Sequence, residues 1–329
     1  MSARPLPLIL FVALIIPSLA LAEQPPVLFP RPPELREAVE FWKRVFVAYG
    51  TDHGVVHDSE NLTVVYGVEG LGSRADSGRD RDRKRAQKSI LARYQRALER
   101  FANGQADTAR LFGDDLRVWT ALGKTTDRLR YRRALETLRL QVGQRDRFER
   151  GLTASGPYLG EIRRILRSHG VSDSLAVLPF IESAFNVRAY SKAGAAGLWQ
   201  ITRPAGRRFL RINRRVDERR DPFKSTGAAA RILKENHAFL GTWPLAITAY
   251  NHGPGGVARA VKTLGTRDIA TIIRSYKGKR FGFASRNFYP EFLAALDVIH
   301  NRREYYSGLP APPLEEDLVQ KQGHGQGRR

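Results

Sequence analysis

The sequence predicts a mainly helical protein with one short β-hairpin near its N-terminus. Along most of the chain beyond residue 85, apolar residues recur three and four positions apart with charged residues between them, which is typical of amphipathic helices. Residues 55–68 differ, because two β-branched runs flank a polar Asp-Ser-Glu-Asn turn there. The chain of 329 residues has no cysteine, so a hydrophobic core must stabilise the fold without disulfides.

Residues 1–22 have the composition of a secretory signal peptide. Arg4 provides a positive charge, residues 6–16 form an apolar stretch, and residues 20–22 read Ala-Leu-Ala, a small-x-small cleavage site. The apolar stretch is short and is interrupted and flanked by prolines, which disfavours a membrane span, although a retained N-terminal anchor is the alternative. The absence of cysteine excludes a lipidated N-terminal cysteine. We therefore expect an exported protein of the periplasm or cell envelope.

The rest of the chain divides into three predicted regions. The Gly and Ser residues of SGPY, 155–158, are expected to interrupt the helical pattern and to mark the boundary between the first and second regions. The following EIRRILRSHG reads as a new helix that ends at Gly170. Within the first region, residues 71–85 are polar and charged and are expected to form a mobile loop. The regions are an Arg-rich helical region at 23–155 that contains the hairpin near 55–68, a helical domain at 156–306 and a disordered tail at 307–329.

The formal net charge of +22 favours an anionic partner. Nucleic acid, anionic lipid and an acidic cell-wall polymer all meet this criterion. Export makes nucleic acid the weakest of the three, because a nucleic-acid binder would have to keep its leader inside the cell. The densest basic run, RRFLRINRRVDERRD at 207–221, reads either as a solvated helix face and loop or as a docking surface for an anionic envelope polymer.

The motifs predict neither a metal site nor an organic cofactor. The seven histidines are scattered, and neither an HExxH motif nor a Cys/His cluster occurs. The GxSxG motif of many serine hydrolases is absent. GPGG at 253–256 is not followed by the Lys of a phosphate-binding loop, so we interpret it as a turn between helices.

The first candidate catalytic group is Glu182, the one carboxylate in the apolar segment LAVLPFIESAFN at 175–186. An ionised carboxylate buried without a partner costs roughly several kcal/mol, so the group either finds partners or has its pKa raised. Pro179 cannot donate a backbone hydrogen bond within a helix, which favours a position for Glu182 near a helix end, facing a groove. From these residues alone, a paired structural acid and a working acid are equally good interpretations.

Two later segments supply polar groups that suit an amide-bearing ligand. AYSKAGAAGLWQ combines small residues, which allow close approach, with Ser191 and Gln200, and AITAYNHG places Tyr250 and Asn251 before a glycine stop. Tyr, Asn, Gln, Ser and one Glu would suit a site for N-acetylated sugars. Taken singly, Trp199 is more typical of a core residue, and Tyr250 is more typical of a half-buried ring with a satisfied hydroxyl.

The motifs Glu-Ser at 182–183, Gly-Leu-Trp-Gln at 197–200 and Ala-Tyr-Asn-His-Gly at 249–253, in that order, strongly resemble those of the soluble-type lytic transglycosylases. The same fold group includes the g-type lysozymes. The resemblance extends from about Tyr158 to Tyr305, and the earlier segment with the hairpin resembles the N-terminal region of the membrane-bound lytic murein transglycosylase D-like subgroup. It implies a lysozyme-like helical catalytic domain preceded by a helical region with a short hairpin.

The resemblance also implies a reaction and a set of site residues. Enzymes of this family cleave the MurNAc-β-1,4-GlcNAc bond of peptidoglycan glycan strands and form a 1,6-anhydro-MurNAc end, with one glutamate as general acid and base. Glu182 matches that glutamate, and its apolar neighbours would keep it protonated near neutral pH. Tyr250 is implied near the catalytic acid and Asn251 near the acetamido group of the sugar. The positions that match the substrate groove are Ser183, Gln200, Tyr250 and Asn251.

Two features depart from the family pattern. The family often has a Glu-Thr pair and a Tyr in its last motif, where this chain has Ala284-Ser285 and Phe288-Tyr289, so we assign no catalytic role to Tyr289. The tail contains no LysM-type wall-binding repeat. The prediction therefore depends on the three earlier motifs.

Two alternative functions fit the same residues. Most retaining and inverting glycosidases use two carboxylates, so a muramidase that hydrolyses the same bond would need a second acid, with Asp217, Asp221 and Glu235 as candidates. A non-catalytic wall-binding or scaffolding protein would keep the groove and dock through its Arg-rich surface. A single carboxylate instead favours help from the substrate and the ring-closing reaction.

Overall fold

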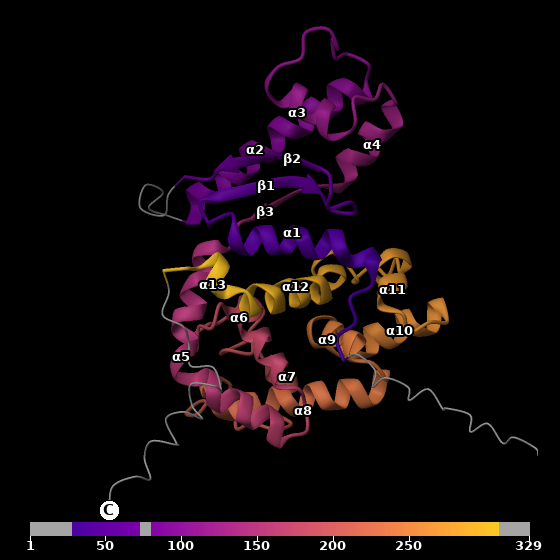
Figure 1. Ribbon diagram of the computed structural model, residues 1–329. Coiled ribbons are helices and arrows are strands. Elements are labelled where there is room, and N and C mark those ends of the chain that lie inside the picture. The colour runs from indigo at the N-terminus through magenta and orange to yellow at the C-terminus, as the bar shows by residue number, and fades with distance from the viewer. Residues whose placement is uncertain (1–27, 73–79, 309–329) are drawn as a thin grey trace, which may run out of the picture.

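The computed structural model describes residues 28–72 and 80–308 (Figure 1). The predicted signal peptide, residues 73–79 of the predicted loop and the predicted tail from residue 309 lie outside the described residues. Residues 80–85, also expected to be loop, form the start of helix α2.

Most of the described chain is helical, which confirms the predicted mainly helical class. The α-helices are α1 (Arg36–Val47), α2 (Asp80–Ala102), α3 (Gly113–Ala121), α4 (Arg128–Thr137), α5 (Arg145–Ser168), α6 (Leu178–Ser183), α7 (Arg203–Gly206), α8 (Pro222–Leu240), α9 (Trp243–His252), α10 (Pro254–Leu264), α11 (Ile269–Ser275), α12 (Phe283–His300) and α13 (Arg302–Tyr305); the strands are β1 (His53–Asp58), β2 (Val65–Gly70) and β3 (Leu138–Val142); short 3₁₀ helices lie at Pro33–Leu35, Asp173–Val177 and Glu218–Arg220.

An antiparallel sheet of strand order β2-β1-β3 lies in the N-terminal half of the described chain. The predicted hairpin is confirmed as β1 and β2, with Val55 opposite Val68. Strand β3 was not predicted, because Leu-Arg-Leu-Gln-Val is only five residues long and directly follows a helical pattern. It pairs along the other edge of β1, with Val55 opposite Gln141. Pairing with a distant strand, rather than the local sequence pattern, therefore decides its conformation.

Strand β1 separates two hydrophobic cores, because successive side chains of a strand point to opposite faces of the sheet. Val55 is buried in the larger core, together with residues of α1, α5, α6, α8, α9 and α12. Its neighbour Val56 is buried in a smaller core, with Tyr66 of β2, Tyr94 of α2 and Tyr131 of α4. The sheet therefore has α1 and the helical body on one side and α2 and α4 on the other (Figure 1).

Helix α12 lies at the centre of the helical body, with α1 packed along it and α6 and α9 against it (Figure 1). Two polar contacts fix α1 to the C-terminal helices. The Trp42 indole donates to Asn287 Oδ1 at 2.9 Å, and the Tyr306 hydroxyl donates to Phe46 O at 2.5 Å. The N-terminal segment thus contributes to the same core that holds the C-terminal helices.

Helix α5 runs without a break through the predicted boundary near residue 155. The predicted interruption of the helix at SGPY is therefore wrong. Buried residues recur every three or four positions from Gly151 to Leu166, so packing against the core keeps this segment helical. Pro157 lies on the exposed side of α5, where water can bond the backbone carbonyl that the missing N–H leaves unpaired. The division of the chain into domains at this point stays a prediction.

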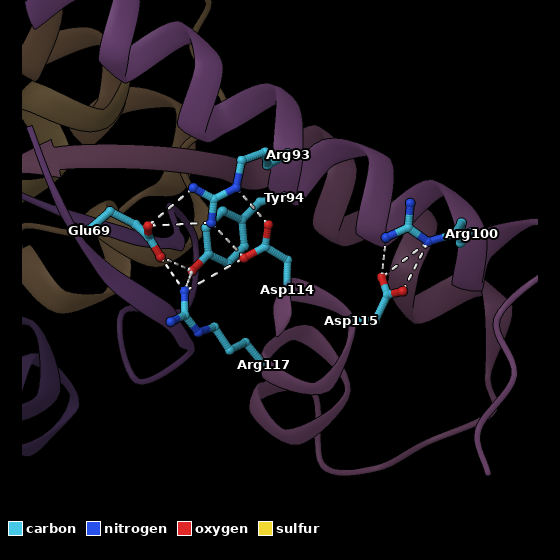
Figure 2. Close-up of polar contacts among 7 residues, drawn as sticks. All are labelled: Glu69, Arg93, Tyr94, Arg100, Asp114, Asp115 and Arg117. Atoms are coloured by element: carbon cyan, nitrogen blue, oxygen red, sulfur yellow. Dashed lines mark hydrogen bonds and ion pairs between the residues drawn. The ribbon is translucent and has the colours of Figure 1, made fainter. Parts of the chain in front are cut away.

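A network of ion pairs fixes α3 to α2 and to strand β2 (Figure 2). Arg93 donates to both carboxylate oxygens of Asp114 at 2.9 Å, and Arg93 and Arg117 both contact Glu69. The Tyr94 hydroxyl completes the network, since it donates to Glu69 at 2.7 Å and accepts from Arg117 at 3.0 Å. The two carboxylates are mostly buried, whereas both guanidinium groups are partly exposed. The network therefore orients α3 more than it stabilises the fold.

Gly67 in β2 leaves room for the Tyr94 hydroxyl. A Cβ atom at position 67 would lie 2.2 Å from that oxygen, a distance at which one of the two groups must move. We expect Gly67→Ala to lower the free energy of unfolding by about 1–3 kcal/mol through overpacking, as measured by denaturant-induced unfolding. In a Tyr94→Phe background the loss should be clearly smaller, because the hydroxyl is gone. Equal losses in the two backgrounds would refute this explanation of the glycine.

Candidate active site

Glu182 lies in the last turn of the short helix α6, as the sequence predicted. Pro179 is the second residue of α6, where no intrahelical N–H bond is needed, so its missing N–H is tolerated at the start of the helix. A 3₁₀ turn, Asp173–Val177, precedes α6 directly. Because a helix of six residues is not stable by itself, tertiary packing must hold the position of Glu182.

The chain leaves α6 through a tight corner made by two residues that are not glycine. Ala184 and Phe185 have positive φ angles of 50° and 56°, a conformation that costs about 1 kcal/mol or more for each. The Phe185 N–H donates to Pro179 O at 3.0 Å and closes the end of the helix. Helix α5 packs on the corner at Gly151, where a Cβ would lie 3.2 Å from Ala184 O. The surrounding structure therefore holds this corner in place, close to Glu182.

The surroundings of Glu182 are apolar. Leu178, Phe180 and Phe185 are buried, and the Glu182 side chain is itself half-buried. Among the residues that the structure describes, no hydrogen bond or ion pair reaches its carboxyl group. Burial raises the pKa of Glu182 from an ordinary value of 4.5 to about 8. The group is therefore neutral at pH 7 and has a proton to donate.

Tyr250, near the end of α9, lies close enough to Glu182 for the two to interact electrostatically. Burial first, and then the Glu182 carboxylate, raise the pKa of the Tyr250 phenol. The Tyr250 hydroxyl donates to Trp199 O at 2.7 Å. The Trp199 indole is fully buried and donates to Thr226 Oγ1 at 2.8 Å. Trp199 is thus a core residue, and Tyr250 connects that core to Glu182.

Ser191 and Gln200 lie in a compact loop at residues 186–201, here called the Tyr190 loop. The Ser191 hydroxyl accepts from the Ala195 N–H at 3.0 Å, and the Gln200 amide donates to Gly197 O at 2.9 Å. Gln200 has a positive φ of 45°, and both side chains are half-buried. These two predicted site residues therefore also shape the loop that presents them.

Ser183 and Asn251 lie at the ends of the helices that carry Glu182 and Tyr250. The Ser183 hydroxyl donates to a backbone carbonyl of its own helix at 3.1 Å. Asn251 is exposed, and its Oδ1 accepts from the Ser285 hydroxyl of α12 at 3.4 Å. The structure thus brings Glu182 and Tyr250 together and leaves Asn251 exposed to solvent.

A second carboxyl group, which the sequence motifs did not indicate, belongs to the same region. Glu291 is half-buried on α12, which packs against α6. Burial first, and then the Glu182 carboxylate, raise the pKa of Glu291 to about 8. Glu182 is therefore not the only carboxyl group of the site, and both groups are neutral at pH 7. Their repulsion is mutual, so ionisation of one opposes ionisation of the other.

The three acids considered for a hydrolytic mechanism are engaged elsewhere. Asp217 pairs with the Arg219 guanidinium at 2.7 Å. Asp221 caps the N-terminus of α8 by accepting from two backbone N–H groups. Glu235 pairs with Arg208 at 2.8 Å. These partners account for all three carboxylates without any role at Glu182.

Arg219 links the Tyr190 loop to the segment before α8 through hydrogen bonds. Its guanidinium is fully buried, donates to the Gly194 and Ile201 carbonyls at 2.6 and 3.0 Å, and makes two hydrogen bonds to Asp217. A Cβ atom at Gly197 would lie 1.9 Å from Arg219 O. The glycine of the Gly-Leu-Trp-Gln motif is thus required because two backbone segments meet there.

No group of three or more His, Asp and Glu side chains within residues 28–72 and 80–308 is arranged to hold a metal ion. Within the same ranges, no helix is long and apolar enough to cross a membrane. The described site offers two neutral carboxylic acids, a tyrosine and several uncharged polar groups.

Comparison with known proteins shows which family this part of the chain resembles. Residues 162–273 match the family described as the transglycosylase SLT domain, a range that includes Glu182, the Tyr190 loop and Tyr250. Residues 162–273 are therefore similar to the transglycosylase SLT domain, and this match bears out the resemblance that the sequence motifs predicted.

More particularly, the chain is related to the membrane-bound lytic murein transglycosylase D of Escherichia coli (strain K12), with 36% identity over 170 residues that cover 51% of this chain and 36% of that protein. The putative tributyltin chloride resistance protein of Alteromonas sp. (strain M-1) is 39% identical over 110 residues, which cover 33% of this chain and 53% of that protein. Among solved structures, an inactive mutant of the lytic transglycosylase Slt from Pseudomonas aeruginosa matches with a TM-score of 0.37 and 21% identity, over 70% of this chain and 39% of that chain. The chain thus spans about a third to about half of the length of these curated relatives.

Proposed function

We propose that this protein is a peptidoglycan lytic transglycosylase in which Glu182 is the general acid and base. The main support is the protonated, half-buried Glu182 carboxyl group, which lies beside Tyr250 within an SLT domain. A group with a pKa of about 8 keeps its proton at neutral pH, which a general acid requires. The name of the Escherichia coli relative, a lytic murein transglycosylase, supports the same substrate.

In the proposed reaction, Glu182 donates its proton to the oxygen that links C1 of N-acetylmuramic acid to N-acetylglucosamine. The C1–O bond breaks, and the N-acetylglucosamine unit leaves with a new hydroxyl group. The 2-acetamido group of the substrate stabilises the electron-poor C1. The ionised Glu182 then accepts the proton of the muramic acid 6-hydroxyl, whose oxygen bonds to C1 and closes the 1,6-anhydro ring. Glu182 is protonated again at the end, and no water is consumed.

Four of the other candidate residues bind substrate in this proposal. The uncharged polar groups of Ser183, Ser191, Gln200 and Asn251 suit the amide and hydroxyl groups of N-acetylated sugars. The Tyr250 hydroxyl is already bonded to a backbone carbonyl, so Tyr250 acts by packing beside the catalytic acid and excluding water. The predicted leader would deliver the protein to the periplasm or cell envelope, where peptidoglycan lies, and the Escherichia coli relative is named as membrane-bound.

The second candidate function, a muramidase, needs an ionised carboxylate that activates water. Glu291 is the acid that acts electrostatically with Glu182, but with a pKa of about 8 it is neutral at pH 7 and holds the proton that a base would have to accept. We infer that Glu291 instead helps to keep Glu182 protonated, because a negative charge on Glu291 opposes the ionisation of Glu182.

Glu291→Gln is therefore expected to move the alkaline limb of the kcat–pH profile to lower pH, by roughly half a unit. In this proposal, a negative charge on Glu291 opposes the ionisation of Glu182 as the pH rises in the wild type, whereas a neutral Gln cannot. Glu291→Asp should keep the limb near its wild-type position. Glu235→Gln, which removes a carboxylate from an exposed ion pair, is the matched control and should not move the limb. If Glu291→Gln also leaves it in place, Glu291 has no such role.

Digestion of isolated peptidoglycan with the purified protein, followed by mass spectrometry of the products, tests the proposed function. We expect products that end in 1,6-anhydro-muramic acid, lighter by one water than products with reducing ends. Reducing ends alone would identify a muramidase. The release of no product at all would support a non-catalytic wall-binding protein.

A further inference from the structure

The Tyr190 loop presents an aromatic ring to solvent beside the candidate active site. Tyr190 is 54% exposed, yet the loop around it is well bonded. The Ser191 N–H donates to Ala195 O at 2.9 Å, and Tyr190 itself forms a β-bridge with Ala196. The loop begins shortly after α6 and contains Trp199, whose carbonyl accepts the bond from the tyrosine beside the catalytic acid. A ring held in this way loses little freedom when a ligand binds to it.

Two arginines fix and flank the Tyr190 ring. The guanidinium carbon of Arg220 lies 5.7 Å from the ring centroid, within the range of a cation–π interaction. The buried Arg219 interacts with the Tyr190 hydroxyl and bonds Gly194 O of the same loop at 2.6 Å. The buried Arg219 therefore holds the Tyr190 side chain in position, and the Arg220 guanidinium places a positive charge beside the ring.

The segment that contains this ring carries a large excess of positive charge. Residues 186–221 contain ten basic residues and three acidic ones. Each of the three acids is already bound within the protein, Asp217 and Glu218 by ion pairs and Asp221 by the N-terminus of α8. Little negative charge is left to neutralise the exposed cations of the segment.

Besides the buried Arg219, the cations close to Tyr190 are Arg188 and Lys192, which lie two residues away in the sequence, and Arg220, which lies beside the ring. All three are exposed, and in the part of the chain that the structure describes none of them pairs with an acid. Lys192 lies in the turn closed by the bond from Gly194 N–H to Ser191 O at 2.9 Å. Guanidinium and ammonium groups in this state bind carboxylates well, and an adjacent aromatic ring can cover an apolar part of the same ligand.

We propose that Tyr190, Arg188, Lys192 and Arg220 form a subsite for the carboxylate-bearing stem peptide of a peptide-substituted glycan strand. This inference rests on the proposed function, since the peptide of peptidoglycan is attached to the muramic acid whose bond would be cut at Glu182. The peptide carries several carboxylates a short distance from the sugar, which suits a basic surface on the loop whose Trp199 carbonyl bonds Tyr250, the tyrosine that interacts with Glu182. The substrate class is therefore peptide-bearing glycan rather than bare glycan.

Two forms of one substrate test this subsite at physiological ionic strength. One is soluble peptide-bearing glycan strands, and the other is the same strands with their carboxylates converted to neutral methylamides. For the wild type, kcat/KM should be higher on the native strands, with most of the difference in KM. In the double variant Lys192→Ala and Arg220→Ala, the ratio of the two kcat/KM values should fall about tenfold, as expected for the loss of hydrogen bonds between charged groups.

The matched control removes the same two charges elsewhere on the SLT domain. Lys262 of α10 and Arg267 after it are exposed, and changing both to Ala should leave the ratio unchanged, with circular dichroism confirming that both double variants are folded. An unchanged ratio in the Lys192 and Arg220 variant, or an equal fall in the control, would overturn the subsite. A wild type that releases no product from either substrate would instead overturn the proposed function.

Discussion

Glu182→Gln is expected to lower the turnover of peptidoglycan by about 10³-fold, within the range of 10²–10⁴ that general acid–base catalysis contributes. The amide keeps the size and the half-buried place of the carboxyl group but has no proton that it can donate and recover. Substrate binding should be retained, so kcat should fall while KM changes little. Quantification of released muropeptides by mass spectrometry during long digestions measures the loss.

Glu161 of α5 provides the matched control for this change. It is an exposed carboxylate paired with Arg164 on the same helix, so Glu161→Gln should keep wild-type turnover. Glu182→Asp, which withdraws the carboxyl group by one methylene, should fall between the wild type and Glu182→Gln. A Glu182→Gln variant that clears peptidoglycan as fast as the wild type would show that Glu182 is not the acid.

Arg219→Ala is expected to lower the free energy of unfolding by about 3–5 kcal/mol, as breaking one partner of a buried ion pair does. The change leaves Asp217 without its counter-ion and removes the donor to two carbonyls of the Tyr190 loop. The Arg219 guanidinium lowers the pKa of Asp217, so the pair is ionised at neutral pH. Its contribution is lost only as the pH falls through that lowered pKa. Denaturant-induced unfolding at pH 7 measures the change.

Arg211 allows a direct comparison, because it also pairs with an acid of the same segment but is 73% exposed. Arg211→Ala should cost less than about 1 kcal/mol. Arg219→Lys should give an intermediate loss, because an ammonium group keeps the charge but cannot make two parallel bonds to Asp217. Equal losses for Arg211→Ala and Arg219→Ala would refute the structural role of the buried guanidinium.

Features that depend on local sequence were predictable. The helical class follows from apolar residues spaced three and four apart, and the hairpin follows from two β-branched runs around a polar turn. The position of Glu182 near a helix end followed from one acid in an apolar run with Pro179 close by. The motifs that surround Glu182 predicted the SLT family, which the match over residues 162–273 confirms.

Features that depend on contacts between distant segments were missed. Strand β3 exists because β1, far earlier in the chain, has a free edge. Helix α5 continues through SGPY because its buried stripe packs on the core. Glu291 follows the same pattern as Glu182, a single acid in the apolar run YPEFLAAL, so the criterion that singled out Glu182 would also have found it. Its relevance, however, depends on the packing of α12 against α6.

The basic run at 207–221 shows a related limit of sequence patterns. Arg219 and Arg220 are adjacent and chemically identical, yet the first is fully buried and bonds three parts of the chain, whereas the second is exposed beside Tyr190. Neither of the two interpretations drawn from the sequence, a solvated face or a docking surface, describes Arg219. Only the three-dimensional arrangement separates a structural arginine from one that is free to bind a ligand.

The kcat–pH profile of the wild-type protein is the decisive experiment for the proposal that burial keeps Glu182 protonated for catalysis. Because the protonated form is the active one, turnover should be fully present at pH 7 and should be lost as the pH rises through about 8. Far-UV circular dichroism at each pH separates this loss from unfolding. Turnover that is already lost as the pH rises through 4.5, the ordinary pKa of a glutamate, would show that Glu182 does not work as a buried acid.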